Sequence, residues 1–211
     1  MMNVSAEDTD ALRELINIGI GRAAGALNDM VGAHVQLRVP SVRLVSQNDI
    51  SEIVASMEEH KLAAVRLDFS GKLHGTATLL FPADSASKLV ALLTGEELGA
   101  PEMDSLRASA LTEVGNILLN GVMGSITNVL GENIHYQLPT YHEETPENLV
   151  KEILSQPDAS VMFAQTHFLV GQTHFSLAQE TIEGDVTLLF GTGSFELLIE
   201  RIHQMHEELP V

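Results

Sequence analysis

The feature that most constrains how this chain folds is an internal duplication. The same order of expected elements occurs twice, over residues 1–99 and 100–211: a long helix, a strand, a short helix, further strands and a final helix. A repeat of this size has to be recognised first, because overlooking it leads to the wrong fold. Only a short stretch, 95–101, separates the halves. We therefore expect them to share one core within a single domain over 1–211.

Hydrophobic periodicity, together with the Gly and Pro residues that interrupt it, gives the expected elements. The expected helices are 5–32, 48–57, 82–95, 101–131, 145–156 and 194–206. The expected strands are 34–39, 62–69, 73–81, 134–138, 161–170, 173–179 and 186–190. Pro40 and Pro139 follow the first strand of each half and are expected to end it.

The predicted fold class is α+β. It is a pseudo-twofold tandem repeat with one antiparallel sheet of about six strands. Two long exposed helices carry the candidate site residues, and smaller helices complete the fold. The alternative is two separate lobes.

Composition narrows the classes of function. The chain has 11 Lys and Arg against 29 Asp and Glu, a formal net charge of −18. So acidic a surface repels phosphate groups, which argues against general binding of nucleic acid or anionic lipid. Cysteine is absent, and with it thiol catalysis, disulfides and thiolate metal sites. The N-terminus is polar, and no apolar run reaches the ~20 residues of a membrane span. We expect a cytoplasmic, monomeric protein.

One polar pattern recurs at the same spacing in both long helices. Each copy has Asp or Ser, Glu four residues later, Asn three residues after that, and then Pro, with 22 residues between the Asn and the Pro. The copies are Asp10, Glu14, Asn17 and Pro40 in the first half, and Ser109, Glu113, Asn116 and Pro139 in the second. Positions i, i+4 and i+7 lie along one stripe of a helix. The acid and the amide of each copy should therefore project from one face, toward solvent or a partner.

The residues alone leave two interpretations of this stripe open. A Glu and an Asn three positions apart on an amphipathic helix are commonly a solvated surface. Duplication of an ancestral helix would copy such residues without giving them a function. The matched register of both copies, downstream proline included, weakens the solvated-surface interpretation but leaves both open.

The pattern resembles the signature of the CheC, CheX and FliY phosphatases of bacterial and archaeal chemotaxis. The surrounding segments are similar too: Glu-Leu-Ile-Asn-Ile-Gly-Ile-Gly-Arg-Ala-Ala-Gly-Ala-Leu at 14–27 and Glu-Val-Gly-Asn-Ile-Leu at 113–118. The resemblance spans essentially the whole chain, and its duplicated architecture is most similar to CheC-like members.

This resemblance implies a hydrolase that removes the aspartyl phosphate of a CheY-type response regulator at two active sites. Asn17 and Asn116 would orient the attacking water. Glu14 and Glu113 would dock the regulator by pairing with its Lys. Supporting roles would fall to Asp10, Ser109, Pro40 and Pro139. The alternative is a module that binds the regulator, or the CheD deamidase, with little catalysis of its own.

No cofactor or metal of the chain's own is expected, because the resemblance implies Mg²⁺ held by the regulator. The nine histidines include no HExxH-type spacing that would gather the three ligands of a catalytic zinc. Glycines recur in both long helices, away from the strand-to-helix turns of nucleotide-binding loops. They therefore indicate close helix packing, at Gly19, Gly21, Gly25, Gly115, Gly121 and Gly124.

Overall fold

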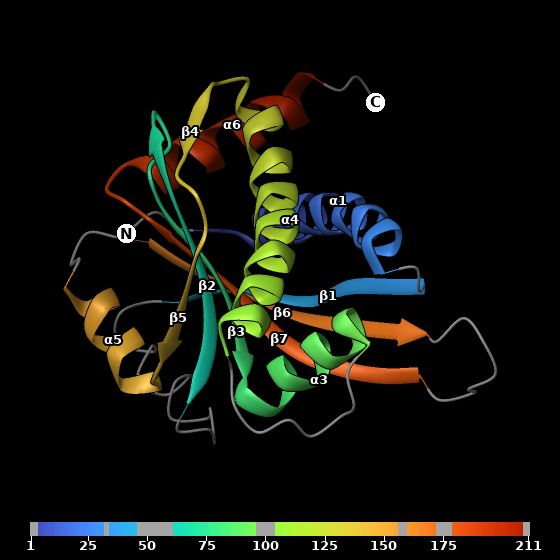
Figure 1. The fold of residues 1–211 in the computed structure, drawn as a ribbon. Helices are drawn as coiled ribbons and strands as arrows, with labels where there is room; N and C mark the ends of the chain where they lie inside the picture. Colours follow the sequence, from blue (N-terminus) through green and yellow to red (C-terminus); the bar gives the residue numbers. More distant parts are fainter. Residues whose placement is uncertain are drawn as a thin grey trace.

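An antiparallel sheet runs through the computed structural model, which describes residues 4–31, 34–45, 61–95, 104–155, 160–171 and 179–208 (Figure 1). Within these ranges the sheet has seven strands in the order β1-β6-β7-β3-β2-β4, with β5 also paired to β2. Along the chain the elements are α1 (Ala6–Val31), β1 (His34–Val45), β2 (Leu62–Gly71), β3 (Gly75–Pro82), α3 (Ala83–Thr94), α4 (Ser105–Leu130), β4 (Ile134–Tyr136), β5 (Thr140–Glu144), α5 (Pro146–Leu154), β6 (Ser160–Gly171), β7 (Gln179–Phe190) and α6 (Ser194–Glu208). The predicted α+β class with one antiparallel sheet is confirmed.

The strand order expresses the duplication. Strands β3 and β7 occupy the same place in their halves and pair at the centre of the sheet. Each is flanked by the preceding strand of its own half, β2 or β6. The first strands, however, are exchanged: β1 pairs with β6 of the second half, while β4 and β5 pair with β2 of the first. Each half thus completes the sheet of the other.

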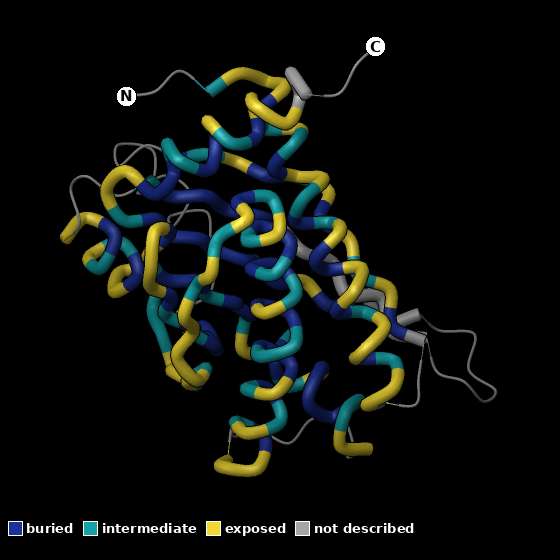
Figure 2. The backbone as a smooth tube through the Cα atoms, turned by 90° about the horizontal axis from the view of Figure 1, so that it is seen from above, coloured by how far each residue is buried: buried dark blue, intermediate teal, exposed yellow. Residues whose placement is uncertain are grey.

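Helices cover both faces of the sheet unequally. The larger core cluster joins one face to apolar side chains of α1, α3, α4 and α6. A smaller cluster joins the other face to α5 through Leu149 and Ile153. Figure 2 shows the buried backbone at the sheet and along the inner sides of the long helices, with exposed residues on their outer sides. None of the described helices is both long and apolar enough to cross a membrane.

The two long helices cross in direct backbone contact. A Cβ added to Gly19 would overlap the carbonyl oxygen of Gly121, and one added to Gly121 would lie 2.6 Å from the carbonyl oxygen of Gly19. Gly115 of α4 packs in the same way on the side chain of Val65 in β2. The prediction of close packing is confirmed at these three glycines, whereas Gly21, Gly25 and Gly124 face open space.

Local capping explains where several helices begin and end. The backbone N–H of Ser5 donates to Asp8, and that of Asp8 donates to the Ser5 hydroxyl, which is the reciprocal pattern of a capping box. Gly95 and Gly131 end their helices in left-handed conformation. The predicted start of the second long helix at Pro101 is wrong. The helix begins at Ser105, because the Asp104 side chain accepts from the N–H of Arg107 at 2.9 Å.

Strand ends differ more from the expectations. Pro40 does not end its strand: β1 continues to Val45, with a register shift between Arg38 and Ser41 that accommodates the proline as a bulge. The expected strand 134–138 already ends at Tyr136 as β4, and a strand that was not expected, β5, follows Pro139 at Thr140–Glu144. Strand β7 begins at Gln179, before the expected 186. The expected helix 48–57 and residues 173–178 of the expected strand lie outside the described residues.

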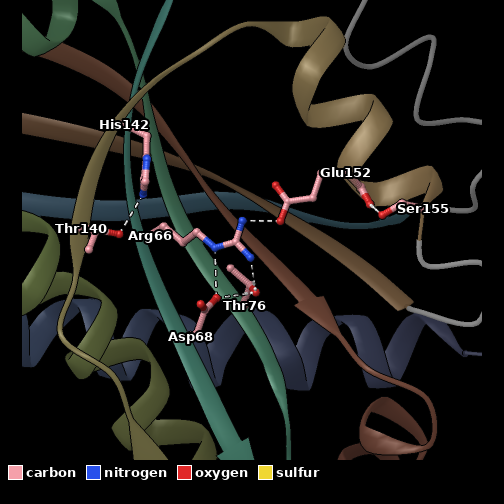
Figure 3. A network of polar contacts seen from close by, with 7 residues as sticks. All are labelled: Arg66, Asp68, Thr76, Thr140, His142, Glu152 and Ser155. Carbon is pink, nitrogen blue, oxygen red and sulfur yellow. Dashed lines mark hydrogen bonds and ion pairs between the residues drawn. The ribbon is translucent and has the colours of Figure 1, made fainter.

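A polar network holds α5 against the sheet (Figure 3). Arg66 on β2 pairs with Glu152 on α5, and its Nε lies 3.0 Å from Asp68 Oδ1. Its Nη2 also donates to Thr76 Oγ1 on β3 at 3.2 Å. Partial burial by itself lowers the pKa of Arg66, but the two carboxylates raise it above its ordinary value. The guanidinium therefore remains charged and ties three elements together.

Candidate functional site

Helix α1 presents the first copy of the signature on its outer side. Leu12, Ile16 and Ile20 are buried against the sheet at helical spacing. Asp10 and Glu14 lie on the exposed side, and Asn17 is half-buried at its border. The apolar stripe therefore fixes which way the polar stripe faces.

The start of α1 is anchored to α6. Asp8, the capping residue, is buried, and its second oxygen lies 2.6 Å from His203 Nε2 on α6. Burial alone would raise the pKa of Asp8. The hydrogen bonds from Ser5 and His203 outweigh it and hold that pKa below its usual value. Asp8 is therefore a carboxylate that stabilises the helix carrying the first copy.

Helix α4 presents the second copy in the same way. Leu111, Val114 and Leu118 are fully buried. Ser109 and Glu113 lie on the exposed side, and Asn116 is half-buried. Because α1 and α4 cross in contact, both copies belong to the helical layer on one face of the sheet (Figure 1).

The two glutamates are free to bind a partner's cation. Within the described part of the chain, neither Glu14 nor Glu113 takes part in a hydrogen bond or ion pair, and both are exposed. A carboxylate so placed can pair with an incoming ammonium without first breaking a contact.

The residues one turn before the glutamates have partners of their own. Asp10 Oδ1 lies 2.9 Å from Arg13 Nη2. The Ser109 hydroxyl donates to the Ser105 carbonyl at 2.8 Å. Among the described residues, neither is hydrogen-bonded to the glutamate that follows it.

The carboxamide of Asn17 is bound to the backbone of β1. Its Oδ1 accepts from the N–H of Val39 at 3.0 Å, and its Nδ2 donates to the Val39 carbonyl at 3.3 Å and the Arg13 carbonyl at 3.0 Å. Val39 and Pro40 form the bulge, where the pairing of β1 with β6 shifts register. Asn17 therefore supplies the backbone of Val39 with hydrogen-bond partners that the neighbouring strand does not supply at this bulge. This contact explains the separation of amide and proline in the first copy.

The carboxamide of Asn116 is held differently. Its Oδ1 accepts from Asn120 Nδ2 at 2.6 Å. Leu138, the counterpart of Val39, is 88% exposed, whereas Val39 is 3% exposed. Both Asn116 and Leu138 are described, and no hydrogen bond joins them. The amide group of Asn116 thus keeps its N–H donors for an outside ligand.

Sequence reasoning missed two residues of this arrangement. Asn120 follows Asn116 by four positions, a spacing at which helical side chains meet, so it could have been noticed. Val39 contributes only backbone groups, and no residue type signals that role. Pro40 lies next to Val39 in the motif, but the proline does not indicate that the Asn17 side chain bonds to the Val39 backbone.

Within the described ranges, no group of three or more His, Asp or Glu side chains is arranged to hold an ion.

The known proteins to which this chain is similar include chemotaxis proteins. Residues 63–163 match the family model of the chemotaxis phosphatase CheX. The CheY-P phosphatase CheC of Bacillus subtilis (strain 168) is 24% identical over 203 residues, covering 92% of this chain and 93% of CheC.

Solved structures share the fold. FliY of Thermotoga maritima superposes with a TM-score of 0.72 at 18% identity, covering 99% of this chain and 100% of that one. A Borrelia burgdorferi CheX, solved in complex with CheY, BeF3 and Mg²⁺, has a TM-score of 0.50 at 16% identity, covering 85% and 99%. The fold over nearly the whole chain is thus that of the FliY structure.

Proposed function

We propose that this chain, which belongs to the CheC/CheX/FliY family of chemotaxis proteins, hydrolyses the aspartyl phosphate of a CheY-type response regulator. The observation that carries the proposal is the duplicated acid and amide, with both glutamates exposed and unpaired on the outer side of a long helix. The likeness to a CheY-P phosphatase over 92% of the chain supports it.

The chemistry asks little of the phosphatase beyond positioning. Hydrolysis of an acyl phosphate proceeds by in-line attack of water on phosphorus, and the regulator would hold the Mg²⁺ and a Lys against the phosphoryl oxygens. The phosphatase can add an oriented water in a site from which bulk water is excluded. No covalent intermediate and no cofactor of this chain's own is needed.

The residue types suit this division of work. A carboxamide accepts from water through its oxygen and donates through its NH₂ without adding negative charge near phosphate. Asn17 and Asn116 would take that role. Glu14 and Glu113 would bind the Lys of the regulator, because a carboxylate placed directly on a phosphoryl group would be repelled.

A second candidate function is regulator binding without turnover, alone or together with a CheD-type deamidase. The observation that favours it is the occupied carboxamide of Asn17, which the Val39 backbone already uses. A site of that kind could dock a regulator through Glu14 and yet fail to orient water.

The experiment that tests the proposal is the decay of a phosphorylated CheY-type regulator in Mg²⁺ with catalytic amounts of this protein. We expect faster decay, with each molecule of protein clearing many molecules of regulator. Binding to the phosphorylated regulator without any acceleration would reject catalysis and leave the binding module.

A further inference from the structure

We infer that the two copies do unequal work: the second carries most of the turnover, and Asn120 is the residue that positions its amide. The inference rests on the proposed phosphatase function and deepens it. It starts from the different partners of two carboxamides that occupy the same position in their copies.

In the first copy, the carboxamide of Asn17 is already bonded to strand β1 of the same half. Asn17 Oδ1 already accepts from the N–H of Val39, and its Nδ2 already donates to the carbonyls of Val39 and Arg13, so binding a water through this NH₂ requires one of those bonds to break. Val39 is 3% exposed and lies in the bulge, so no water or strand neighbour readily replaces the amide. A site whose competent form is a minor state works in proportion to the population of that state.

In the second copy, one hydrogen bond orients the carboxamide of Asn116, and its N–H donors stay available. Asn120 Nδ2 donates to Asn116 Oδ1, which fixes the plane of the Asn116 carboxamide. The oxygen keeps a second lone pair, and the NH₂ keeps its donors, so the group can still hold a water. The residue that corresponds to Val39 does not cover the amide here: Leu138 is 88% exposed, and no hydrogen bond joins it to Asn116 within the described residues.

Asn120 has no equivalent in the first copy. The corresponding position is Gly21, which has no side chain to reach Asn17. The first copy therefore orders its amide with the backbone of β1, and the second orders it with a side chain of the same helix. Only the second arrangement leaves the outer side of the amide unobstructed.

Asn120→Ala tests the positioning role, with Gly21→Ala as the matched control at the same register. We expect Asn120→Ala to lower kcat by roughly tenfold or more while KM for the phosphorylated regulator stays, because orientation is lost but docking by Glu113 is kept. Asn120→Gln retains the donor and should recover part of the loss. Gly21→Ala, in open space, should match wild type. Wild-type kcat for Asn120→Ala would overturn the role of Asn120.

Glu14→Gln against Glu113→Gln tests the inequality without risk to the fold, since both side chains are exposed and unpaired. We expect kcat/KM to fall by roughly tenfold for Glu113→Gln and by less than about threefold for Glu14→Gln. Equal losses, or a larger loss for Glu14→Gln, would overturn the inequality while leaving the phosphatase intact. If wild type gives no acceleration, the proposed function fails and the inequality fails with it.

Discussion

The carboxamide of Asn17 links two elements, bonding the Arg13 carbonyl within α1 and both backbone groups of Val39 in β1. Among the described residues, the carboxamide of Asn116 bonds Asn120 alone, on its own helix. At the scale of the residue, one amide contributes to holding the fold and the other is available for chemistry. Stability and activity should therefore respond to different substitutions.

Asn17→Ala should lower the free energy of unfolding by roughly 1–3 kcal/mol, because it leaves buried backbone groups of Val39 without partners. Asn116→Ala loses one exposed hydrogen bond and should change stability by about 0.5 kcal/mol or less. Urea unfolding of the two variants checks this, and similar losses would show that the Val39 contact contributes little.

Asp8 should give the fold a specific sensitivity to acid. Its pKa in the folded protein lies below the ordinary value of 3.8, so its stabilising contribution is complete above that pH and is lost as pH falls through the lowered pKa. Melting temperatures should show wild type losing stability more steeply below pH 3.8 than Asp8→Asn, and Asp8→Asn less stable near neutral pH. Parallel pH profiles would contradict the role of Asp8.

At the scale of the elements, the two long helices depend on glycine where they cross. Gly19→Ala should destabilise by roughly 1–3 kcal/mol, because the added methyl overlaps the backbone of Gly121 and Val122. Gly25→Ala, in open space on the same helix, should stabilise by about 0.5–1 kcal/mol. Thermal unfolding of the pair measures the difference; equal stability would mean that the helices can separate at little cost.

At this scale, the sequence predicts the element boundaries that depend on residues nearby in the chain, and it does not predict those that depend on distant pairing. Gly95 and Gly131 end their helices through backbone conformation, and Thr145 caps α5 through its own side chain, so nearby residues suffice. The continuation of β1 past Pro40 depends on pairing with β6. The paired residues lie 116 to 124 positions apart, from Val45 with Val161 to Ser41 with Gln165, so no local pattern predicts the pairing.

The candidate site likewise has some features that local sequence predicts and others that depend on tertiary packing. The position of the acids and amides on exposed helix faces follows from helical periodicity, and the structure places Glu14 and Glu113 as expected. The contact of Asn17 with Val39 arises only when α1 packs on β1. The motif positions match in both copies, so by themselves they do not predict that Asn17 and Asn116 have different partners.

At the scale of the molecule, each half supplies strands to the other. Strand β1 completes the sheet beside β6, and β4 and β5 complete it beside β2. Because of this exchange, each half depends on the other for strand partners, although each has helices and strands of its own.

Residues 1–99 expressed alone should therefore fail to form a folded monomer, because β1 lacks β6 and β2 lacks β4 and β5. We expect either an unfolded chain or a dimer in which two copies exchange β1. Circular dichroism with size-exclusion chromatography distinguishes these states, and a folded monomeric half would contradict the interdependence.

The most direct measurement of the central claim is the decay of a phosphorylated CheY-type regulator with wild type and with the double variant Asn17→Ala, Asn116→Ala. The double variant must first be shown to be folded by circular dichroism. Our account predicts acceleration by wild type and decay at the spontaneous rate with the folded double variant. Wild-type acceleration by a folded double variant would contradict the claim that these amides orient the attacking water.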